Sequence, residues 1–153
     1  MNQNSPVFSM FIIVALTLGL AFTVSPAGKS YANSKPKLDA ERYYTDGLQL
    51  SQANYWKEAA DEFRKAIQVD PEHKLAYANL GVALSQTGKH KKALLAFDEA
   101  IRLGYDHALL RYNRGLSFAS LNLIEEAVKE IELSLKKDFR NVRGLYNLGR
   151  LYL

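Results

Sequence analysis

The chain has 153 residues, of which 48% are hydrophobic and 24% charged, a composition typical of an ordered globular protein. It carries 20 Lys and Arg against 16 Asp and Glu, and the two signs alternate along the sequence, so no basic block indicates nucleic acid binding. Cysteine is absent, which excludes disulfides, thiolate metal sites, cysteine nucleophiles and a lipid-attachment cysteine.

The first predicted element is an uncharged apolar stretch from Val7 to Val24. As a helix it would be about 27 Å long, which is almost enough to span a bilayer. Small residues follow at Ser30-Tyr31-Ala32, as in a signal-peptidase site. We therefore expect residues 1–32 to be a signal peptide cleaved after Ala32, or a membrane anchor, and residues 33–39 to be a linker.

Three arrangements of this N-terminal part stay open. The apolar stretch is longer than an ordinary signal-peptide core and no Lys or Arg precedes it, which favours an uncleaved anchor. It is followed by Lys29, Lys35, Lys37 and Arg42, and the positive-inside rule would then keep the rest of the chain in the cytoplasm. Our first expectation is export with cleavage, which makes the protein periplasmic or secreted. The alternatives are an anchor that leaves the rest of the chain outside the cytoplasm and an inverted anchor that keeps it inside.

From residue 40 onward the sequence repeats every 34 residues. The recurring positions hold a glycine, a small residue and a bulky apolar residue in each unit. They are Gly47, Gly81, Gly115 and Gly149; Ala59, Ala93 and Ala127; and Phe63, Phe97 and Ile131. The period predicts units at residues 40–73, 74–107, 108–141 and an incomplete 142–153.

Each unit is predicted to contain two helices. Apolar residues recur at steps of three, four and seven, as in an amphipathic helix. The helices are separated by breaks such as Gln86-Thr87-Gly88-Lys89, and the first unit closes at Asp70-Pro71-Glu72, where proline ends the helix. The recurring glycine and alanine are expected where the paired helices cross, because small residues allow a close approach.

A 34-residue helix-turn-helix unit with the pattern W-x2-L-G-x2-Y, then A-x3-F, then P is the signature of the tetratricopeptide repeat (TPR) family, which this chain resembles. The first unit departs from it where Asp46 replaces leucine, and the third is looser, with Ser134 and Phe139 where alanine and proline are usual. The resemblance implies an all-α solenoid of about three and a half antiparallel helix pairs. It also implies that the first helices line a concave groove, which holds a peptide or helix of a partner protein.

The groove has candidate binding residues at two repeat positions. Asparagine recurs two residues before each glycine of the last three units, at a position that faces the groove in the family, and its amide offers both a donor and an acceptor. Hydrogen bonding between helices is the alternative role. The position just before this one holds a tyrosine in three of the four units. The residues are Asn79, Asn113 and Asn147, with Tyr44, Tyr112 and Tyr146.

Arg111, Arg114, Arg143 and Arg150 concentrate on the first helices of units three and four. They predict a basic end of the groove that would bind an acidic peptide or a C-terminal carboxylate, although a solvated helix face is the alternative. The predicted peptide-binding set is Tyr44, Asn79, Tyr112, Asn113, Arg143, Tyr146, Asn147 and Arg150. The chaperone-binding clamp of some family members needs Lys and Asn where Tyr44 and Leu48 stand here, so heat-shock chaperones are not expected as partners.

No chemistry beyond binding is indicated. His73, His90 and His107 fall at unit ends and an interhelix turn, where we interpret them as loop residues, and no metal site is expected. No phosphate-binding glycine loop, nucleophile elbow or His-Glu-x-x-His helix occurs, so neither an enzyme nor a cofactor is predicted.

The last predicted helix keeps an apolar outer face with Leu145, Leu148 and Leu151, whereas solenoids usually end on a polar one. Either the sequence is the N-terminal part of a longer array, or this end packs against a second copy or a partner; we expect self-association. The predicted function is a peptide-binding scaffold in an envelope or membrane-associated assembly. A structural subunit that stacks through its apolar end, and an accessory domain of a longer enzyme, are the alternatives.

Overall fold

The computed structural model describes residues 34–140 and 142–151, and the apolar stretch predicted as a signal peptide or anchor lies outside them. The described part contains seven helices and no strand. Within these two ranges, no helix is both long and apolar enough to cross a membrane. Residues 38–153 form one compact unit, and every described core residue belongs to it, so this part has the core that it needs to fold by itself.

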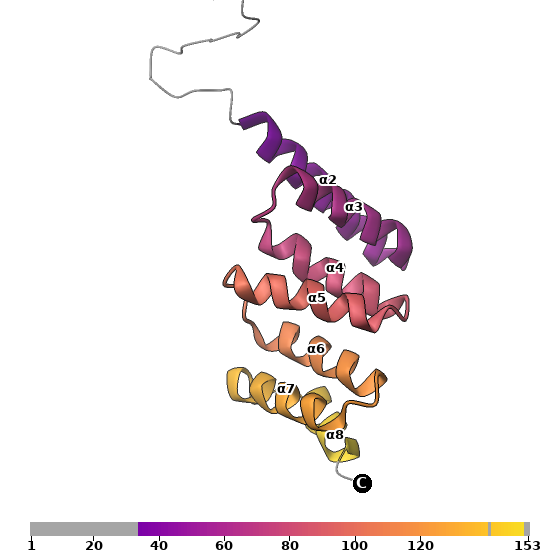
Figure 1. Ribbon diagram of the computed structural model, residues 1–153, viewed down its shortest axis with the longest axis vertical. Coiled ribbons are helices and arrows are strands. Elements are labelled where there is room, and N and C mark those ends of the chain that lie inside the picture. Colours follow the sequence, from indigo (N-terminus) through magenta and orange to yellow (C-terminus); the bar gives the residue numbers. More distant parts are fainter. Residues whose placement is uncertain (1–33, 141, 152–153) are drawn as a thin grey trace, which may run out of the picture. The chain divides into compact units, whose positions relative to one another are not determined.

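The helices alternate between first and second members of the repeat units. The first helices are α2 (Ser34–Gln52), α4 (Lys74–Gln86), α6 (Ala108–Ser120) and α8 (Val142–Leu151). The second helices are α3 (Trp56–Val69), α5 (His90–Arg102) and α7 (Ile124–Lys137). Each second helix packs against the first helix of the next unit, so the pairs stack in chain order (Figure 1). The predicted all-α stack of helix pairs is confirmed.

The recurring glycines lie where the two helices of a unit cross. A Cβ atom at this position would overlap the large apolar residue found 16 positions later, which explains why the position stays glycine. The distances from an ideal Cβ are 2.6 Å for Gly47 to Phe63, 2.5 Å for Gly81 to Phe97 and 2.8 Å for Gly115 to Ile131. The alanines Ala59, Ala93 and Ala127 are fully buried. The predicted steric role of both small residues is therefore correct.

The first helices α2, α4 and α6 end in the same left-handed turn. Asn54, Gly88 and Asn122, again 34 residues apart, have φ values of 63°, 74° and 60°. Glycine and asparagine tolerate this conformation better than other residues. In unit two, Lys89 N donates to Leu84 O at 2.9 Å, the hydrogen bond that closes a Schellman motif. Because the turn is the same in these units, equivalent residues of the first and second helices face each other in each of them.

The linker predicted for residues 33–39 is wrong from Ser34 onward, because α2 begins there. Pro36 falls in the first helical turn, where a backbone N–H has no helical partner and proline is tolerated. Ala40 is fully buried, so the core-facing side of α2 begins shortly after Pro36.

Candidate functional site

The predicted tyrosines and asparagines meet between successive first helices. Asn79 on α4 donates from Nδ2 to the Tyr44 hydroxyl on α2 at 3.2 Å. Asn147 on α8 donates in the same way to the Tyr112 hydroxyl on α6 at 2.8 Å. Two of the three asparagines thus hold neighbouring first helices together, the alternative role that the sequence left open.

Tyr44 is a packing residue as well as an acceptor. Its ring centroid lies 5.9 Å from that of Phe63 and 4.8 Å from that of His73. Burial raises the pKa of the Tyr44 phenol, the charges of Tyr105 and Glu41 raise it further, and the hydrogen bond from Asn79 opposes them.

Asn113 has no such tyrosine. The residue 35 positions earlier is Ala78, and the half-buried Asn113 amide makes no hydrogen bond to another residue of the described chain. Tyr105 packs against His107 at a tilt with ring centroids 4.4 Å apart, much as Tyr44 packs against His73 one unit earlier. Tyr105 therefore contacts His107 as Tyr44 contacts His73, but it does not accept a hydrogen bond from Asn113 as Tyr44 does from Asn79.

A pocket of about 390 Å³ lies between α6 and α8. Its lining residues are Leu116, Ala119, Ser120, Ile131, Asn147, Arg150 and Leu151. Beside it, Tyr146 is 67% exposed and the Arg150 guanidinium lies 5.9 Å from its ring centroid. Arg143, also on α8, is exposed, and neither arginine forms an ion pair with a carboxylate of the described residues. We call the surface of α6 and α8 that carries the pocket, Arg143 and Tyr146 the first-helix face.

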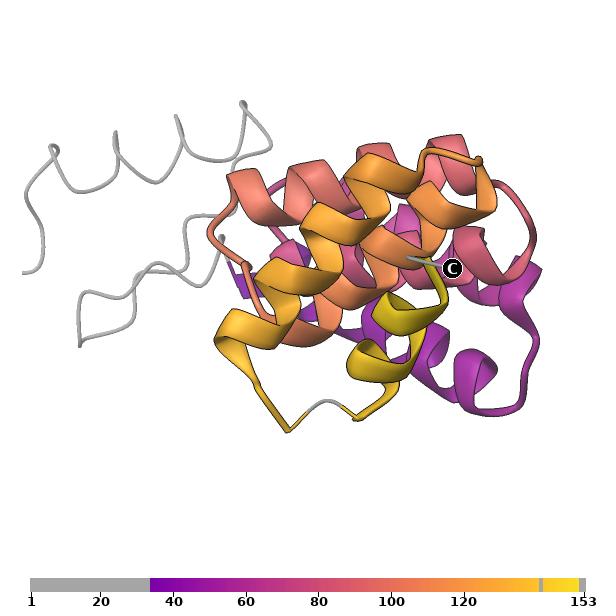
Figure 2. The ribbon, with the colours of Figure 1, turned by 90° about the horizontal axis from the view of Figure 1, so that it is seen from below.

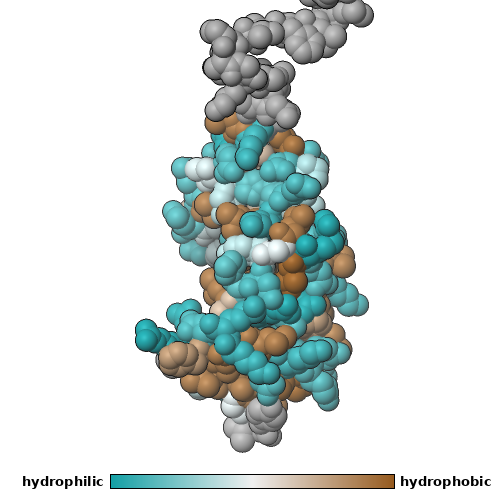
Figure 3. Space-filling view, turned by 90° about the vertical axis from the view of Figure 1, so that its left-hand side faces the viewer, coloured by the Kyte–Doolittle hydropathy of each residue, from teal (hydrophilic) through white to brown (hydrophobic). Residues whose placement is uncertain are grey.

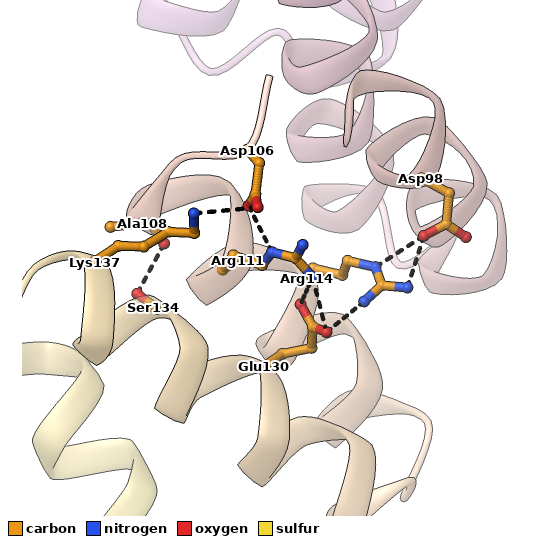
Figure 4. Close-up of polar contacts among 8 residues, drawn as sticks. All are labelled: Asp98, Asp106, Ala108, Arg111, Arg114, Glu130, Ser134 and Lys137. Atoms are coloured by element: carbon orange, nitrogen blue, oxygen red, sulfur yellow. Dashed lines mark hydrogen bonds and ion pairs between the residues drawn. The ribbon is translucent and has the colours of Figure 1, made fainter. Parts of the chain in front are cut away.

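The other two arginines predicted for the basic end are held by carboxylates (Figure 4). Arg111 Nε lies 2.7 Å from Asp106 Oδ1, and its Nη1 lies 3.1 Å from Glu130 Oε2. Arg114 Nη1 lies 2.6 Å from Glu130 Oε1, and its Nη2 lies 2.7 Å from Asp98 Oδ1 on α5. A third cation, Lys137, completes the chain of charges at 3.1 Å from Asp106 Oδ2.

The pKa values reflect this pairing. The hydrogen bond from Arg111, with that from Lys137, lowers the pKa of Asp106 to about 2 against the opposing effect of burial, and the pKa of Arg111 is raised chiefly by the same bond. Arg114 is also neutralised by its partners. The basic end is therefore smaller than predicted, because only Arg143 and Arg150 keep their charge available.

Glu130 is the residue that the sequence analysis missed. It is buried on α7 between two arginines, although carboxylates are rarely buried without partners. A signal was present: Arg111, Arg114 and Glu130 replace Tyr77, Leu80 and Ala96 of the preceding unit. Opposite charges that enter three apolar repeat positions together indicate an ion-paired network.

The interpretation of the histidines as loop residues holds for His73 and His107, which precede α4 and α6, and is wrong for His90. His73 is buried and caps α4, since its Nδ1 accepts a hydrogen bond from Ala76 N at 3.2 Å. Its Nε2 has no hydrogen bond and lies 3.7 Å from the Glu41 carboxylate. His90 is the first residue of α5. Across the two described ranges, no group of three or more His, Asp or Glu residues is arranged to hold a metal ion.

Three solved structures of similar fold are TPR domains or proteins. The first TPR of Spaghetti (RPAP3), bound to HSP90 peptide SRMEEVD, has a TM-score of 0.72 and 22% identity over 76% of this chain and 92% of that one. The second TPR domain of human RPAP3, in complex with HSP70 peptide SGPTIEEVD, gives 0.72 and 20% over 77% and 98%. YrrB, a TPR protein with an unusual peptide-binding site, gives 0.69 and 23% over 86% and 64%.

The sequence itself supports the same assignment. No curated protein matched the chain. A family model described as Tetratricopeptide repeat (TPR_16) matches residues 44–104 and 86–138, which together cover more than half of the chain. This protein belongs to the tetratricopeptide repeat family.

Proposed function

We propose that this protein is a non-enzymatic scaffold that binds an acidic segment of a partner protein on its first-helix face. The carrying observation is the pocket between α6 and α8, where Arg150 and the nearby Arg143 form no ion pair with any carboxylate of the described residues. The two arginines of α6 are paired with carboxylates, so Arg143 and Arg150 are the arginines of the first-helix face that remain available to a ligand. Arginine binds carboxylates through charge-assisted hydrogen bonds, often with two at once.

The surroundings favour a partner segment that is also apolar. Leu116 and Ala119 line the pocket, and Leu109, which is the repeat equivalent of Arg143, is 67% exposed. Tyr146 adds a broad, exposed ring with a polar tip beside Arg150. A segment with carboxylates next to apolar side chains would satisfy both kinds of group.

Similarity to other repeat proteins supports the proposal by analogy. The two RPAP3 domains are described in complex with peptides that contain two adjacent glutamates and end in aspartate. Tyr44 and Leu48 still occupy the positions where the chaperone-binding clamp needs Lys and Asn. We therefore propose the chemistry of an acidic peptide, and not a heat-shock chaperone, as the ligand.

The test is a selection from a random 12-residue peptide library on immobilised residues 33–153, followed by fluorescence anisotropy with the enriched peptides. Acidic residues should be enriched. Arg143→Glu/Arg150→Glu should weaken binding at least about tenfold, because it removes two favourable charge interactions and adds two repulsive ones.

The matched control is Lys91→Glu/Lys92→Glu, which makes the same change of charge at two exposed residues of α5. It should leave the affinity within about twofold, because screened interactions at a distance are small. Enriched peptides without acidic residues, or equal losses in both double variants, would contradict the proposal.

We also propose that this interaction takes place outside the cytoplasm, in an envelope or membrane-associated assembly. The support is the uncharged stretch Val7 to Val24 and the small residues at Ser30-Tyr31-Ala32. N-terminal sequencing of the protein from its native host tests it. An N-terminus at Asn33 agrees with export and cleavage, whereas a retained N-terminus together with protection from external protease contradicts it.

A further inference from the structure

The first-helix face continues from α6 and α8 onto α4 and α2. Successive first helices are neighbours, since Asn79 joins α4 to α2, Asn147 joins α8 to α6, and α4 contacts α6. Figure 2, which looks along the stack from the α8 end, shows the earlier helix pairs following behind α7 and α8. A partner segment that crosses the pocket between α6 and α8 can therefore extend over all of the first helices.

One repeat position of this face carries opposite charges at its two ends. It lies seven residues before Arg150 and its repeat equivalents. Seven residues are about two helical turns, so both positions share one side of each helix. The residues at the earlier position are Glu41, Leu75, Leu109 and Arg143, which we call the charged column. The column is acidic on α2, apolar on α4 and α6, and basic on α8.

Both charged residues of the column are available to a ligand. The Glu41 side chain is 56% exposed and forms no ion pair with a Lys or Arg of the described residues. The His73 ring, whose Nε2 lies 3.7 Å from Glu41, accepts a hydrogen bond through Nδ1. This ring is therefore neutral and leaves the charge of the carboxylate uncompensated. Arg143 is exposed, and no described carboxylate pairs with it.

Between its charged ends the face is apolar. Leu75 is half-buried and Leu109 is 67% exposed. The position seven residues later adds three partly buried residues, Leu48, Val82 and Leu116. The space-filling view of the side on which α4 and α6 begin shows hydrophobic residues set among hydrophilic ones along the stack (Figure 3). A ligand that covers these leucines would gain from apolar side chains in its middle.

An amide in the middle of the face favours an extended ligand over a helix. Asn79 and Asn147 donate to tyrosines of the preceding first helices. The half-buried Asn113 side chain makes no hydrogen bond within the described chain, so it can donate to and accept from a ligand. An extended segment offers free backbone N–H and C=O groups to such an amide, whereas the backbone groups of a helix are already paired.

The spacing of the column sets the length of the segment. Packed helices lie about 8–10 Å apart, so the three steps from α2 to α8 separate Glu41 from Arg143 by roughly 24–30 Å. An extended chain rises about 3.3 Å per residue. Its two charged groups must therefore stand about seven to nine residues apart.

We propose that the first-helix face selects an extended partner segment whose two ends carry opposite charges. A Lys or Arg of the segment pairs with Glu41, apolar side chains cover Leu75 and Leu109, and the carboxylates lie at the basic end on α8. A segment that is acidic throughout would place a carboxylate beside Glu41, where the charges repel. The inference rests on the proposed acidic-peptide site and adds Glu41 as a second determinant of specificity.

The test uses two labelled 12-residue peptides of identical composition, so net charge cannot explain a difference between them. In the spaced peptide, two lysines and two glutamates stand at opposite ends of eight alternating leucines and serines. In the adjacent peptide, the lysines stand directly beside the glutamates at one end. In fluorescence anisotropy with residues 33–153, the spaced peptide should bind at least about threefold more tightly, because only it can reach both charged ends of the column.

The decisive variant of the protein is Glu41→Lys. It should weaken binding of the spaced peptide at least about fivefold and abolish its advantage over the adjacent peptide, because an attraction becomes a repulsion. Glu41→Gln, which removes the charge but keeps the size, should show a smaller loss in the same direction. The matched control is Glu58→Lys, the same change at an exposed residue of α3, which should keep the preference. Circular dichroism confirms that each variant is helical.

Equal affinity for the two peptides, or a preference that survives in Glu41→Lys, would overturn the inference. So would the absence of saturable binding of the spaced peptide up to about 1 mM. The proposed function is judged separately, because Arg143→Glu/Arg150→Glu should weaken both peptides. If it does so while Glu41→Lys has no effect, the acidic-peptide site stands and the role of Glu41 is wrong. If it weakens neither peptide, the acidic-peptide site itself is wrong.

Discussion

Units two and three share one repeat plan but hold their helices together by different chemistry. In unit two the interface between α4 and α5 is apolar, with Leu80, Ala96 and Phe97 all buried. In unit three the equivalent residues are Arg114, Glu130 and Ile131, so two of the three apolar positions carry opposite charges.

The exchange extends to smaller residues of unit three. Ser134 stands where unit two has Ala100, and its hydroxyl donates to Ala108 O at 2.8 Å. Ser117 stands where unit two has Ala83, and its hydroxyl donates to Asn113 O at 3.1 Å. Both serines are fully buried. The glycine crossing is the constant of the repeat, and the rest of the interface is free to change from apolar to polar as long as each polar group finds a partner.

The largest effect should come from breaking the charge network of unit three. Glu130→Ala leaves Arg111 and Arg114 without their shared buried carboxylate, and we expect it to lower the free energy of unfolding by about 3–5 kcal/mol. Urea denaturation followed by circular dichroism measures it. A loss below about 1 kcal/mol would show that the network contributes little.

Replacing the whole network sharpens the same comparison. Arg111→Tyr/Arg114→Leu/Glu130→Ala installs the residues of unit two, and we expect it to be neutral or stabilising, because apolar packing often equals a buried ion pair. If this triple variant is as unstable as Glu130→Ala, the two chemistries are not interchangeable.

Replacement of the repeat glycine by alanine should change stability in opposite directions in unit two, where a second helix covers the glycine, and in α8, where no described helix does. Gly81→Ala places a Cβ 2.5 Å from Phe97, and we expect a loss of about 1–3 kcal/mol from overpacking. Gly149→Ala meets no atom and should instead stabilise by up to about 1 kcal/mol. Thermal or urea unfolding of both variants measures the difference, and effects of the same sign would contradict the steric account.

The helix caps offer a smaller contrast. His73 accepts a hydrogen bond from Ala76 N, whereas His107 precedes α6 without a side-chain cap. His73→Ala should lower the free energy of unfolding by about 1 kcal/mol and His73→Asn should retain most of it, because asparagine is a good N-cap. His107→Ala should have almost no effect. Equal losses from His73→Ala and His107→Ala would argue against the cap.

The smallest effect should be the pH dependence due to Asp106. Its pKa is lowered from 3.8 to about 2 in the folded protein. The stabilisation is therefore fully present above pH 3.8 and is lost as the pH falls toward 2. Because 34% of the side chain is exposed, we expect less than about 1 kcal/mol. Asp106→Asn should lose less stability than the parent between pH 5 and pH 2.5 in urea titrations. A larger loss in Asp106→Asn than in the parent would contradict the predicted direction of the pH dependence.

The repeat itself could be predicted from the sequence, whereas the hydrogen bonds between units could not. The 34-residue period, the helix pairs and the glycine and alanine crossings depend on residue size and spacing, which a sequence displays directly. The hydrogen bond from Asn79 to Tyr44 joins different units and depends on the angle between stacked helices. The α2 start also escaped prediction, since Pro36 is compatible with either a linker or a first turn.

The arginines show the same limit at the candidate site. Four of them share two first helices, but only the position of Glu130 on the buried side of α7 separates Arg111 and Arg114 from Arg143 and Arg150. Helical spacing alone allows Glu130 to face either water or the core, and only comparison with the buried Ala96 of the preceding unit would have placed it inside.

The most direct test of the proposed scaffold is photo-crosslinking in the native host with p-benzoylphenylalanine at position 146, next to the pocket, or at position 95 on α5. Both positions are 67% exposed, so the probes are equally accessible. The account predicts a specific adduct at position 146 that Arg143→Glu/Arg150→Glu abolishes, and none at position 95. An adduct only at position 95, or one at position 146 that persists in the double variant, would contradict it.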